Sequence, residues 1–235
     1  GFSSNDLTIK SAIHNLNLLF VTERSEKKNL RVSEVSGFEI LEYDEWKNHL
    51  SAGVTLAAHL ENAVTRKYLT DLANASTARF LDGFKSEAYV SGFIRGAKYT
   101  RKDVFRVLQW DKRPNEQNVG GYIVSADGSN CPIFVTYHKE EHIAETTKYE
   151  DRFVNPGHLI YMSKNRRNLA SPDVRAMLNH EATGMRMPLF VKKNDDEGLD
   201  FYYLGELTAI TDKFVDTTMS NDDRNQVSVV KMEFL

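Results

Sequence analysis

Two aromatic side chains flank a carboxylate in the segment YEDRF, residues 149–153. If this segment is extended, Tyr149, Asp151 and Phe153 point to one side, while Glu150 and Arg152 point to the other. Aromatic rings can stack on a flat heterocycle, and a carboxylate can accept a hydrogen bond from the exocyclic amine of cytosine. The pattern therefore indicates a pocket for a flat base. The alternative is structural, with Tyr149 and Phe153 in a core and Asp151 capping a turn.

Two further stretches supply polar and aromatic residues to the same pocket. In HLIYMS, Tyr161 and Ser163 share one face, and we expect Ile160 and Met162 to face the core. In GGYIV, Tyr122 follows two glycines, which allow a close approach of the backbone to a ligand. The predicted pocket consists of six residues: Tyr149, Asp151, Phe153, Tyr161, Ser163 and Tyr122.

A cationic segment, KNRRN at residues 164–168, follows directly. Between residues 148 and 187 there are seven lysines and arginines against four acidic residues, whereas between 191 and 235 there are five against ten. The whole chain has a net charge of −3, so this asymmetry indicates one cationic face rather than a uniformly basic protein. Such a face suits a nucleic-acid backbone, for which we predict five residues: Lys164, Arg166, Arg167, Arg101 and Lys139. The alternative is a solvated loop.

Patterns for catalysis are weak in this chain. HKEEH contains His138, Glu141 and His142 at the spacing of an inverted zinc-protease motif, but that chemistry needs a helix, and the motif follows a strand-like run. We find neither a phosphate-binding glycine loop nor a nucleophile elbow. The lone Cys131 lies in an apolar stretch and suits burial in a reducing cytoplasm. We therefore expect no catalytic residue, no metal, no cofactor and a cytoplasmic location.

Periodicity predicts the elements that position these residues. Apolar spacing predicts helices at 7–20 and 55–84, and a short strand or turn before a helix around Glu45, so we assign residues 1–96 to a helical subdomain. Two more helices are expected: one after Thr100, with Asp103 completing a capping box, and one in SPDVRAML, capped by Ser171. Strand-like runs fill the rest of residues 97–235, including a hairpin at NDDEG. The predicted class is α+β, with a curved, mainly antiparallel sheet or barrel in the second part.

Six segments of the second part, taken in order, resemble a known family. They are YTRKDVFRVLQW, CPIFVTYHK, YEDRF, YMSKNRRN, SPD and LFVKK…FYYLGE. Together they resemble the C-terminal, modified-cytosine-binding domain of helicase-containing Type IV (modification-dependent) restriction endonucleases, which is similar to SRA domains. The resemblance covers residues 99–206 well and extends more loosely on both sides.

The resemblance implies an SRA-like (PUA-like) curved antiparallel β-barrel with two flanking helices. It implies a non-catalytic module that flips 5-methylcytosine, with 5-hydroxymethylcytosine as a further candidate, out of double-stranded DNA into the aromatic pocket. The implied partners are this DNA and the nuclease and helicase/ATPase domains of the same full-length chain. No apolar run is long enough to indicate a membrane partner. Two other classes stay open: a protein- or RNA-interaction module, and a zinc hydrolase using HKEEH.

Overall fold

The computed structural model describes residues 7–17, 22–25, 28–31, 40–44, 46–47, 49–110, 114, 119–137, 151–220 and 226–235. The chain divides into two compact units, Gly1–Ser86 and Glu87–Leu235. This division lies before the expected boundary at 96/97, because the hairpin of β5 (Tyr89–Val90) and β6 (Phe93–Ile94) places Phe93 in a core of the second unit. The described residues form six α-helices and several sheets, so the fold is mixed α and β.

The first unit combines helices with two antiparallel hairpins, and so is less helical than the sequence pattern predicts. Where a helix is expected around Glu45, the described residues form the β3–β4 hairpin; Glu45 itself lies outside them. The Asp44 carboxylate accepts hydrogen bonds from the backbone N–H groups of Trp46 and Lys47, which stabilises a turn between the two strands. The elements are α1 (Leu7–Leu16), β1 (Thr22–Ser25), β2 (Lys28–Arg31), β3 (Leu41–Asp44), β4 (His49–Ala52), α3 (Val54–Leu60) and α4 (Ala63–Phe84).

The helical pattern at 55–84 forms two helices, α3 and α4, rather than one. Asn62 separates them because its backbone is extended and its side chain accepts hydrogen bonds from the N–H groups of Val64 and Thr65. Such an N-cap starts a new helix at a point that apolar spacing does not reveal. Within the described ranges, no helix is long and apolar enough to cross a membrane.

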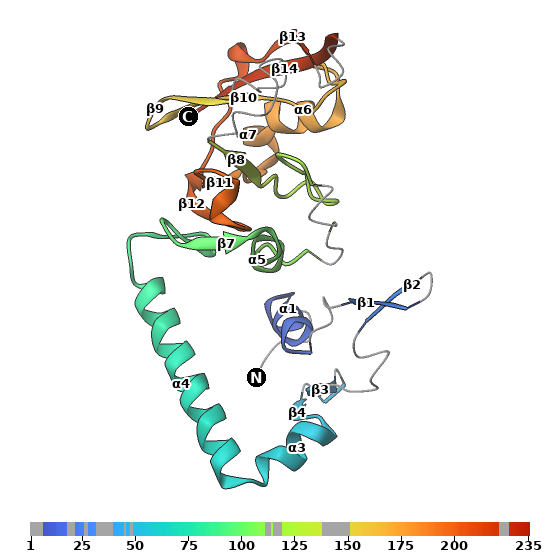
Figure 1. The fold of residues 1–235 in the computed structure, drawn as a ribbon, viewed down its shortest axis with the longest axis vertical. Coiled ribbons are helices and arrows are strands. Elements are labelled where there is room, and N and C mark those ends of the chain that lie inside the picture. Colours follow the sequence, from blue (N-terminus) through green and yellow to red (C-terminus); the bar gives the residue numbers. More distant parts are fainter. Residues whose placement is uncertain are drawn as a thin grey trace. The chain divides into compact units, whose positions relative to one another are not determined.

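The second unit is built around two four-stranded sheets (Figure 1). One has the strand order β7-β12-β11-β8 and the other β13-β14-β10-β9, and all neighbours are antiparallel except β8 and β11. The described strands thus form two sheets rather than the single closed barrel that the family resemblance implies. The strands are β7 (Lys98–Thr100), β8 (Ile133–Thr136), β9 (Arg152–Asn155), β10 (His158–Met162), β11 (Pro188–Lys192), β12 (Asp200–Glu206), β13 (Val215–Ser220) and β14 (Gln226–Phe234).

The described residues of the second unit also form three α-helices and two short 3₁₀ segments: α5 (Arg101–Val107), α6 (Pro172–Leu178), α7 (His180–Thr183), η3 (Asp195–Glu197) and η4 (Thr211–Lys213). The capping box predicted for α5 is confirmed, since Thr100 and Asp103 exchange side-chain and backbone hydrogen bonds. Ser171 occupies the N-cap position predicted for α6, directly before Pro172, but its hydroxyl bonds to Asn168 and not to the helix. The NDDEG segment does join β11 and β12 as an antiparallel hairpin.

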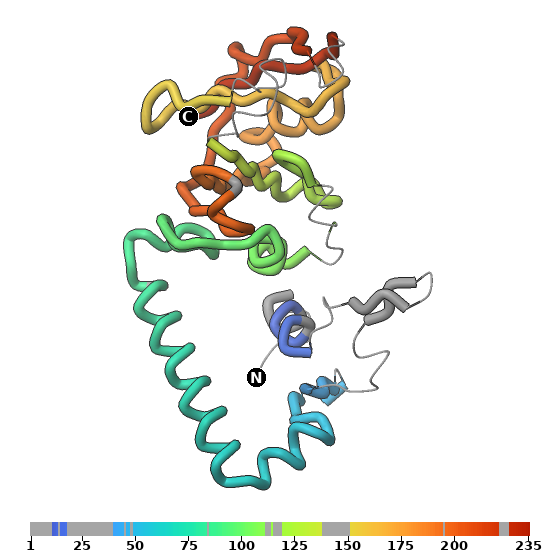
Figure 2. Tube along the Cα trace, in the orientation of Figure 1, coloured from blue at the N-terminus to red at the C-terminus, as the bar shows by residue number. Residues whose placement is uncertain are grey.

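Strand β8 lies between two hydrophobic cores. Its alternate residues Ile133 and Val135 belong to the larger core, which also receives α6, while Phe134 belongs to an aromatic core. Cys131, just before β8, is buried in the larger core as predicted, and its burial raises the pKa of its thiol to about 12. Figure 2 draws the β9–β10 hairpin in yellow. Because successive side chains of β8 point to opposite sides, this one strand contributes residues to both cores.

Candidate functional site

A cavity of about 320 Å³ lies in the second unit and is lined by residues of both large sheets. One sheet lines it from β8, and the other lines it from β10 and from the residue that precedes β9. A cavity of this size is at the small end of the range for ligand sites, so it suits a single ring system. The lining residues are Arg101, Gly120, Gly121, Tyr122, Phe134, Thr136, Asp151, Tyr161, Met162, Ser163, Lys164 and Asn165.

Four of the six residues predicted for a base pocket line this cavity: Tyr122, Asp151, Tyr161 and Ser163. Phe153 does not line it; its ring packs against the larger core and lies 6.1 Å from the ring of Tyr137, centroid to centroid. Tyr149 lies outside the described residues, as do Lys139 and the HKEEH motif. The described part of the chain contains no group of three or more metal-ligating side chains.

Asp151, which directly precedes β9, is hydrogen-bonded to β10, the partner strand of the hairpin. Its carboxylate Oδ1 accepts a hydrogen bond from the backbone N–H of Met162 at 2.9 Å. The side chain is half-buried, and it faces the cavity together with Met162. The hydrogen bond fixes where the carboxylate lies at the cavity.

The faces of β10 differ from the predicted ones. Tyr161 lies in the larger core, where it is 3 % exposed, whereas Met162, expected in the core, is half-buried and lines the cavity. Ile160 is buried as expected. The simple alternation fails because β10 is an inner strand, flanked by β9 and β14, and both of its faces are covered.

Gly121 serves a different purpose from the predicted approach of a ligand. A Cβ at this position would overlap the hydroxyl oxygen of Tyr161 and lie 3.0 Å from its Cζ atom. The absence of a side chain therefore makes room for the Tyr161 phenol inside the pocket wall. Gly120, beside it, has a left-handed backbone with φ of 64°, a conformation that glycine adopts without strain.

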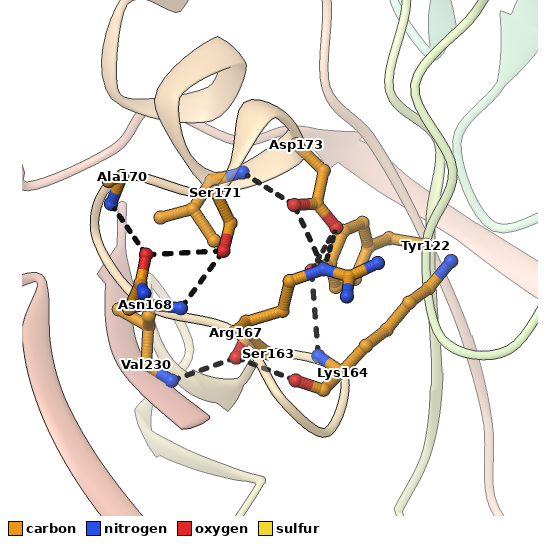
Figure 3. Close-up of polar contacts among 10 residues, drawn as sticks. Tyr122, Ser163, Lys164, Arg167, Asn168, Ala170, Ser171, Asp173 and Val230 are labelled. Atoms are coloured by element: carbon orange, nitrogen blue, oxygen red, sulfur yellow. Dashed lines mark hydrogen bonds and ion pairs between the residues drawn. The ribbon is translucent and has the colours of Figure 1, made fainter. Parts of the chain in front are cut away.

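A carboxylate outside the cavity holds one of its walls (Figure 3). The Tyr122 hydroxyl donates to Asp173 Oδ2 at 3.0 Å, and Arg167 Nε donates to the same oxygen at 2.8 Å. Burial raises the pKa of Tyr122 strongly, and the adjacent Asp173 charge adds to this. Burial also tends to raise the pKa of Asp173, but the hydrogen bonds from Arg167 and Tyr122 outweigh it and hold that pKa below its usual value. The contact is therefore a neutral phenol and a guanidinium on one ionised carboxylate.

Ser163 joins two strands at the cavity wall. Its side chain is fully buried, its hydroxyl accepts from the backbone N–H of Val230 at 2.8 Å, and it donates to the carbonyl of Lys164 at 3.1 Å (Figure 3). The backbone N–H of Ser163 also donates to the Val230 carbonyl. These bonds extend the pairing of β10 with β14 by one residue and anchor the start of the cationic loop.

The cationic loop is held by the fold more firmly than a solvated loop would be. Arg167 forms the ion pair with Asp173, at 2.8 Å, and its backbone N–H donates to Ser228. Arg166 is exposed at the loop tip and has a left-handed backbone, with φ of 59°. Lys164 is half-buried at the cavity, with its ammonium 4.9 Å from the centroid of the Tyr122 ring. The three basic residues of the loop thus have three different environments.

Arg101, the first residue of α5, also makes contacts within the protein. Its guanidinium lies 5.1 Å from the ring centroid of Phe134 and 5.0 Å from that of Phe201, and it donates to the carbonyl of Gly120 at 3.3 Å. Arg101 therefore connects the segment that contains Gly120 to Phe134 of β8, and both residues line the cavity. Of the residues predicted for backbone contact, Arg101 and Lys164 line the cavity instead.

Sequence reasoning missed several residues of this site. The sequence pattern predicts Phe134 and Met162 as core residues of strands, and no pattern indicates that they line a cavity. Asp173 reads only as the second residue of a helix after Pro172, so its contact with Tyr122, which is far away in the sequence, has no local signal. The paired glycines before Tyr122 were the one usable hint of close packing here.

Comparisons with solved structures find similarity to SRA domains and to a modification-dependent restriction endonuclease. The SRA domain of SUVH5, in a complex with hemimethylated CG DNA, is 13% identical, with 64% of this chain and 92% of that chain covered and a TM-score of 0.39. The sulfur-binding and SRA domains of ScoMcrA, complexed with phosphorothioated DNA, are 11% identical over 91% of this chain and 63% of that chain, with a TM-score of 0.40. The modification-dependent restriction endonuclease AspBHI is 13% identical over 63% and 76%, with a TM-score of 0.41.

No curated protein matches the chain. A family model does: it is described as a domain of unknown function, DUF3427, and it matches residues 93–235, which is more than half of the chain and includes every lining residue of the cavity. The chain therefore belongs to the DUF3427 family.

Proposed function

We propose that the second unit is a non-catalytic DNA-binding module that takes a modified cytosine, 5-methylcytosine or 5-hydroxymethylcytosine, into the cavity between the sheets. The observation that carries this proposal is the composition of one small cavity: aromatic rings, one carboxylate and one lysine around about 320 Å³. In the proposed complex the base is flipped out of the duplex. Flipping costs a few kcal/mol, which contacts in the cavity must offset.

Stacking supplies the first part of that offset. Tyr122, Phe134 and Tyr161 line the cavity from three different segments, and each is at most 3 % exposed, so the rings are held by the core. Rings fixed in advance lose little entropy when a base enters. Base–aromatic stacking contributes about 1–3 kcal/mol per base. Met162 and Thr136 also line the cavity and can offer apolar surface to a 5-methyl group.

The carboxylate of Asp151 supplies the second part. The exocyclic amine of cytosine is a donor that pairs with carboxylates, whereas the O4 atom of thymine is an acceptor. Because Met162 holds the carboxylate at the cavity, little reorganisation is needed when the amine arrives. A hydrogen bond to a charged group contributes about 1.5–3 kcal/mol. The Asp151 contact therefore favours cytosine, while the apolar lining favours its 5-methyl form.

The backbone of the DNA is contacted, in this proposal, mainly by Arg166. Its side chain is exposed at the tip of the loop that follows the cavity wall, and phosphate contacts need an accessible cation. Arg167 is paired with Asp173, so it supports the loop rather than leading the contact. In the full-length protein we propose that this module directs nuclease and helicase/ATPase domains of the same chain to modified DNA.

The proposal is tested by fluorescence anisotropy with the full chain. The probes are duplexes of one sequence with a single cytosine that is unmodified, 5-methylated or 5-hydroxymethylated, a phosphorothioated duplex, and a single-stranded RNA. Asp151→Ala should lower the preference for the modified duplexes by about ten- to a hundredfold and leave the salt-sensitive binding in place. Asp212→Ala, which removes an exposed carboxylate outside the cavity, is the matched control.

Equal affinity of the wild-type chain for modified and unmodified duplexes would end the proposal. Tighter binding of the RNA than of any duplex would favour an RNA-interaction module instead. If Asp151→Ala stays folded and keeps the full preference, the carboxylate does not contact the base.

A further inference from the structure

Lys164 belongs to the cavity rather than to the outer surface of the cationic loop. It lines the cavity and is half-buried, and its ammonium lies over the Tyr122 ring at 4.9 Å. Its stem lies near the glycine loop, since a Cβ on Gly120 would be 3.5 Å from Lys164 Cε. Figure 3 shows the side chain extending past Tyr122, away from the Arg167–Asp173 ion pair.

The Lys164 ammonium has donors to offer. Among the described residues it makes no hydrogen bond and no ion pair, and the aromatic ring is its one charge-compensating contact. Burial lowers its pKa, while the more distant Asp173 charge partly opposes this effect. A half-buried ammonium with three donor hydrogens is stabilised by an acceptor that enters the cavity.

The donor of Lys164 and the acceptor of Asp151 both belong to residues that line the cavity. The Asp151 carboxylate is fixed on the backbone N–H of Met162, and Lys164 follows Met162 by two residues. The two side chains thus offer one acceptor and one donor to a ligand in the cavity. The edge of a cytosine offers the complement, an amine donor beside the acceptors N3 and O2, whereas thymine offers an acceptor and a donor in the first two places.

We propose that Lys164 is a base-reading residue, which donates to the acceptor edge of the flipped base while Asp151 accepts from its amine. This inference rests on the proposed function, since it assigns a role within the same pocket. It changes the role predicted from the sequence: Lys164 selects the base, and Arg166 contacts the phosphate. The ligand class is an aminopyrimidine, so the pair rejects thymine even though thymine carries the same methyl group as 5-methylcytosine.

Two duplexes of the same sequence test the proposal with the full chain, one with a 5-methylcytosine–guanine pair and one with a thymine–guanine mismatch at that position. The mismatch is easier to flip, so a preference for 5-methylcytosine must come from the base edge. We expect the wild type to prefer 5-methylcytosine by about tenfold or more. Lys164→Met should remove most of this preference and leave the salt dependence unchanged. Arg166→Met should weaken binding to both duplexes equally and reduce the salt slope by about one.

The outcomes separate the two proposals. If the wild type does not distinguish methylated from unmodified cytosine, the proposed function fails. If it does, but Lys164→Met behaves like Arg166→Met in affinity and salt slope, Lys164 contacts phosphate and only this inference is overturned. Lys164→Gln, which keeps a polar side chain, and Lys164→Arg, which keeps the charge, repeat the measurement if the Met variant is poorly folded. We expect Arg to retain more of the preference than Gln.

Discussion

Replacing Gly121 with alanine tests the packing of the pocket wall directly. The added Cβ would overlap the Tyr161 hydroxyl oxygen and lie 3.0 Å from Cζ. The backbone of Gly121 is not left-handed, so the cost is steric rather than conformational. Tyr161 is 3 % exposed and has little room to move. Overfilling a packed core costs about 1–3 kcal/mol, and we expect Gly121→Ala to destabilise the second unit by about 2 kcal/mol.

Urea unfolding followed by tryptophan fluorescence measures this loss. Trp110 stacks on Phe105 in the second unit, with the ring centroids 4.8 Å apart, so its emission reports unfolding there. Trp46 is fully exposed in the first unit and should change little. Gly157→Ala is the matched control, because its Cβ would meet only Asn155 Oδ1, at 3.7 Å. We expect that control to stay within about 0.5 kcal/mol of the wild type.

A second substitution identifies the atom responsible. Tyr161→Phe removes the oxygen that the new Cβ would overlap, and leaves a tight contact with Cζ that a shift of a few tenths of an ångström relieves. The double variant should therefore be more stable than the sum of the two single losses predicts, by about 1 kcal/mol. Additive losses, or a Gly121→Ala variant as stable as Gly157→Ala, would refute the packing argument.

Three further predictions concern the rest of the second unit. Asp173→Asn should destabilise it by about 1–3 kcal/mol, measured by Trp110 emission, because Arg167 loses its ionic partner. Hydrogen bonds, first that from the Ser125 hydroxyl, lower the pKa of Asp127 to about 2; this contribution is present above the unfolded pKa of about 4 and is lost as pH falls towards 2, so Asp127→Asn should make acid unfolding less steep. The fragment Glu87–Leu235 should fold alone, with the same urea midpoint as the second unit of the full chain; a shifted midpoint would show that the first unit stabilises it.

Local patterns predicted the features that depend on local chemistry. The capping box of Thr100 and Asp103 is a property of four consecutive residues, and the structure contains it. Asp151 stood out because a carboxylate between aromatics is unusual in a strand, and it does line the cavity. The same alternation failed for Phe153, which turns to the core, because a period of two says which residues share a side but not how far along the strand the cavity extends.

Features made by distant contacts had no such signal. Asp173 is not among the residues that line the described cavity, yet its carboxylate accepts a hydrogen bond from Tyr122, and nothing near either residue in the sequence indicates the contact. Ser163 carries a hydroxyl that could contact a ligand, but in the structure this hydroxyl accepts a hydrogen bond from the backbone N–H of Val230 in β14. The place of β8 in its sheet depends on its parallel pairing with β11, which no turn motif can predict, since such strands need a long connection.

That parallel pairing has a consequence for how the second unit folds. Ile133 pairs with Leu189, so a long stretch of chain must be ordered before β8 can complete its sheet. Loop closure of this kind is slow, and hence β8 should be among the last strands to gain protection from hydrogen exchange during refolding. Because its side chains enter both cores, neither core is complete before this step. The unit should consequently unfold in one cooperative transition, with the amides of β8 and β11 exchanging only through global opening.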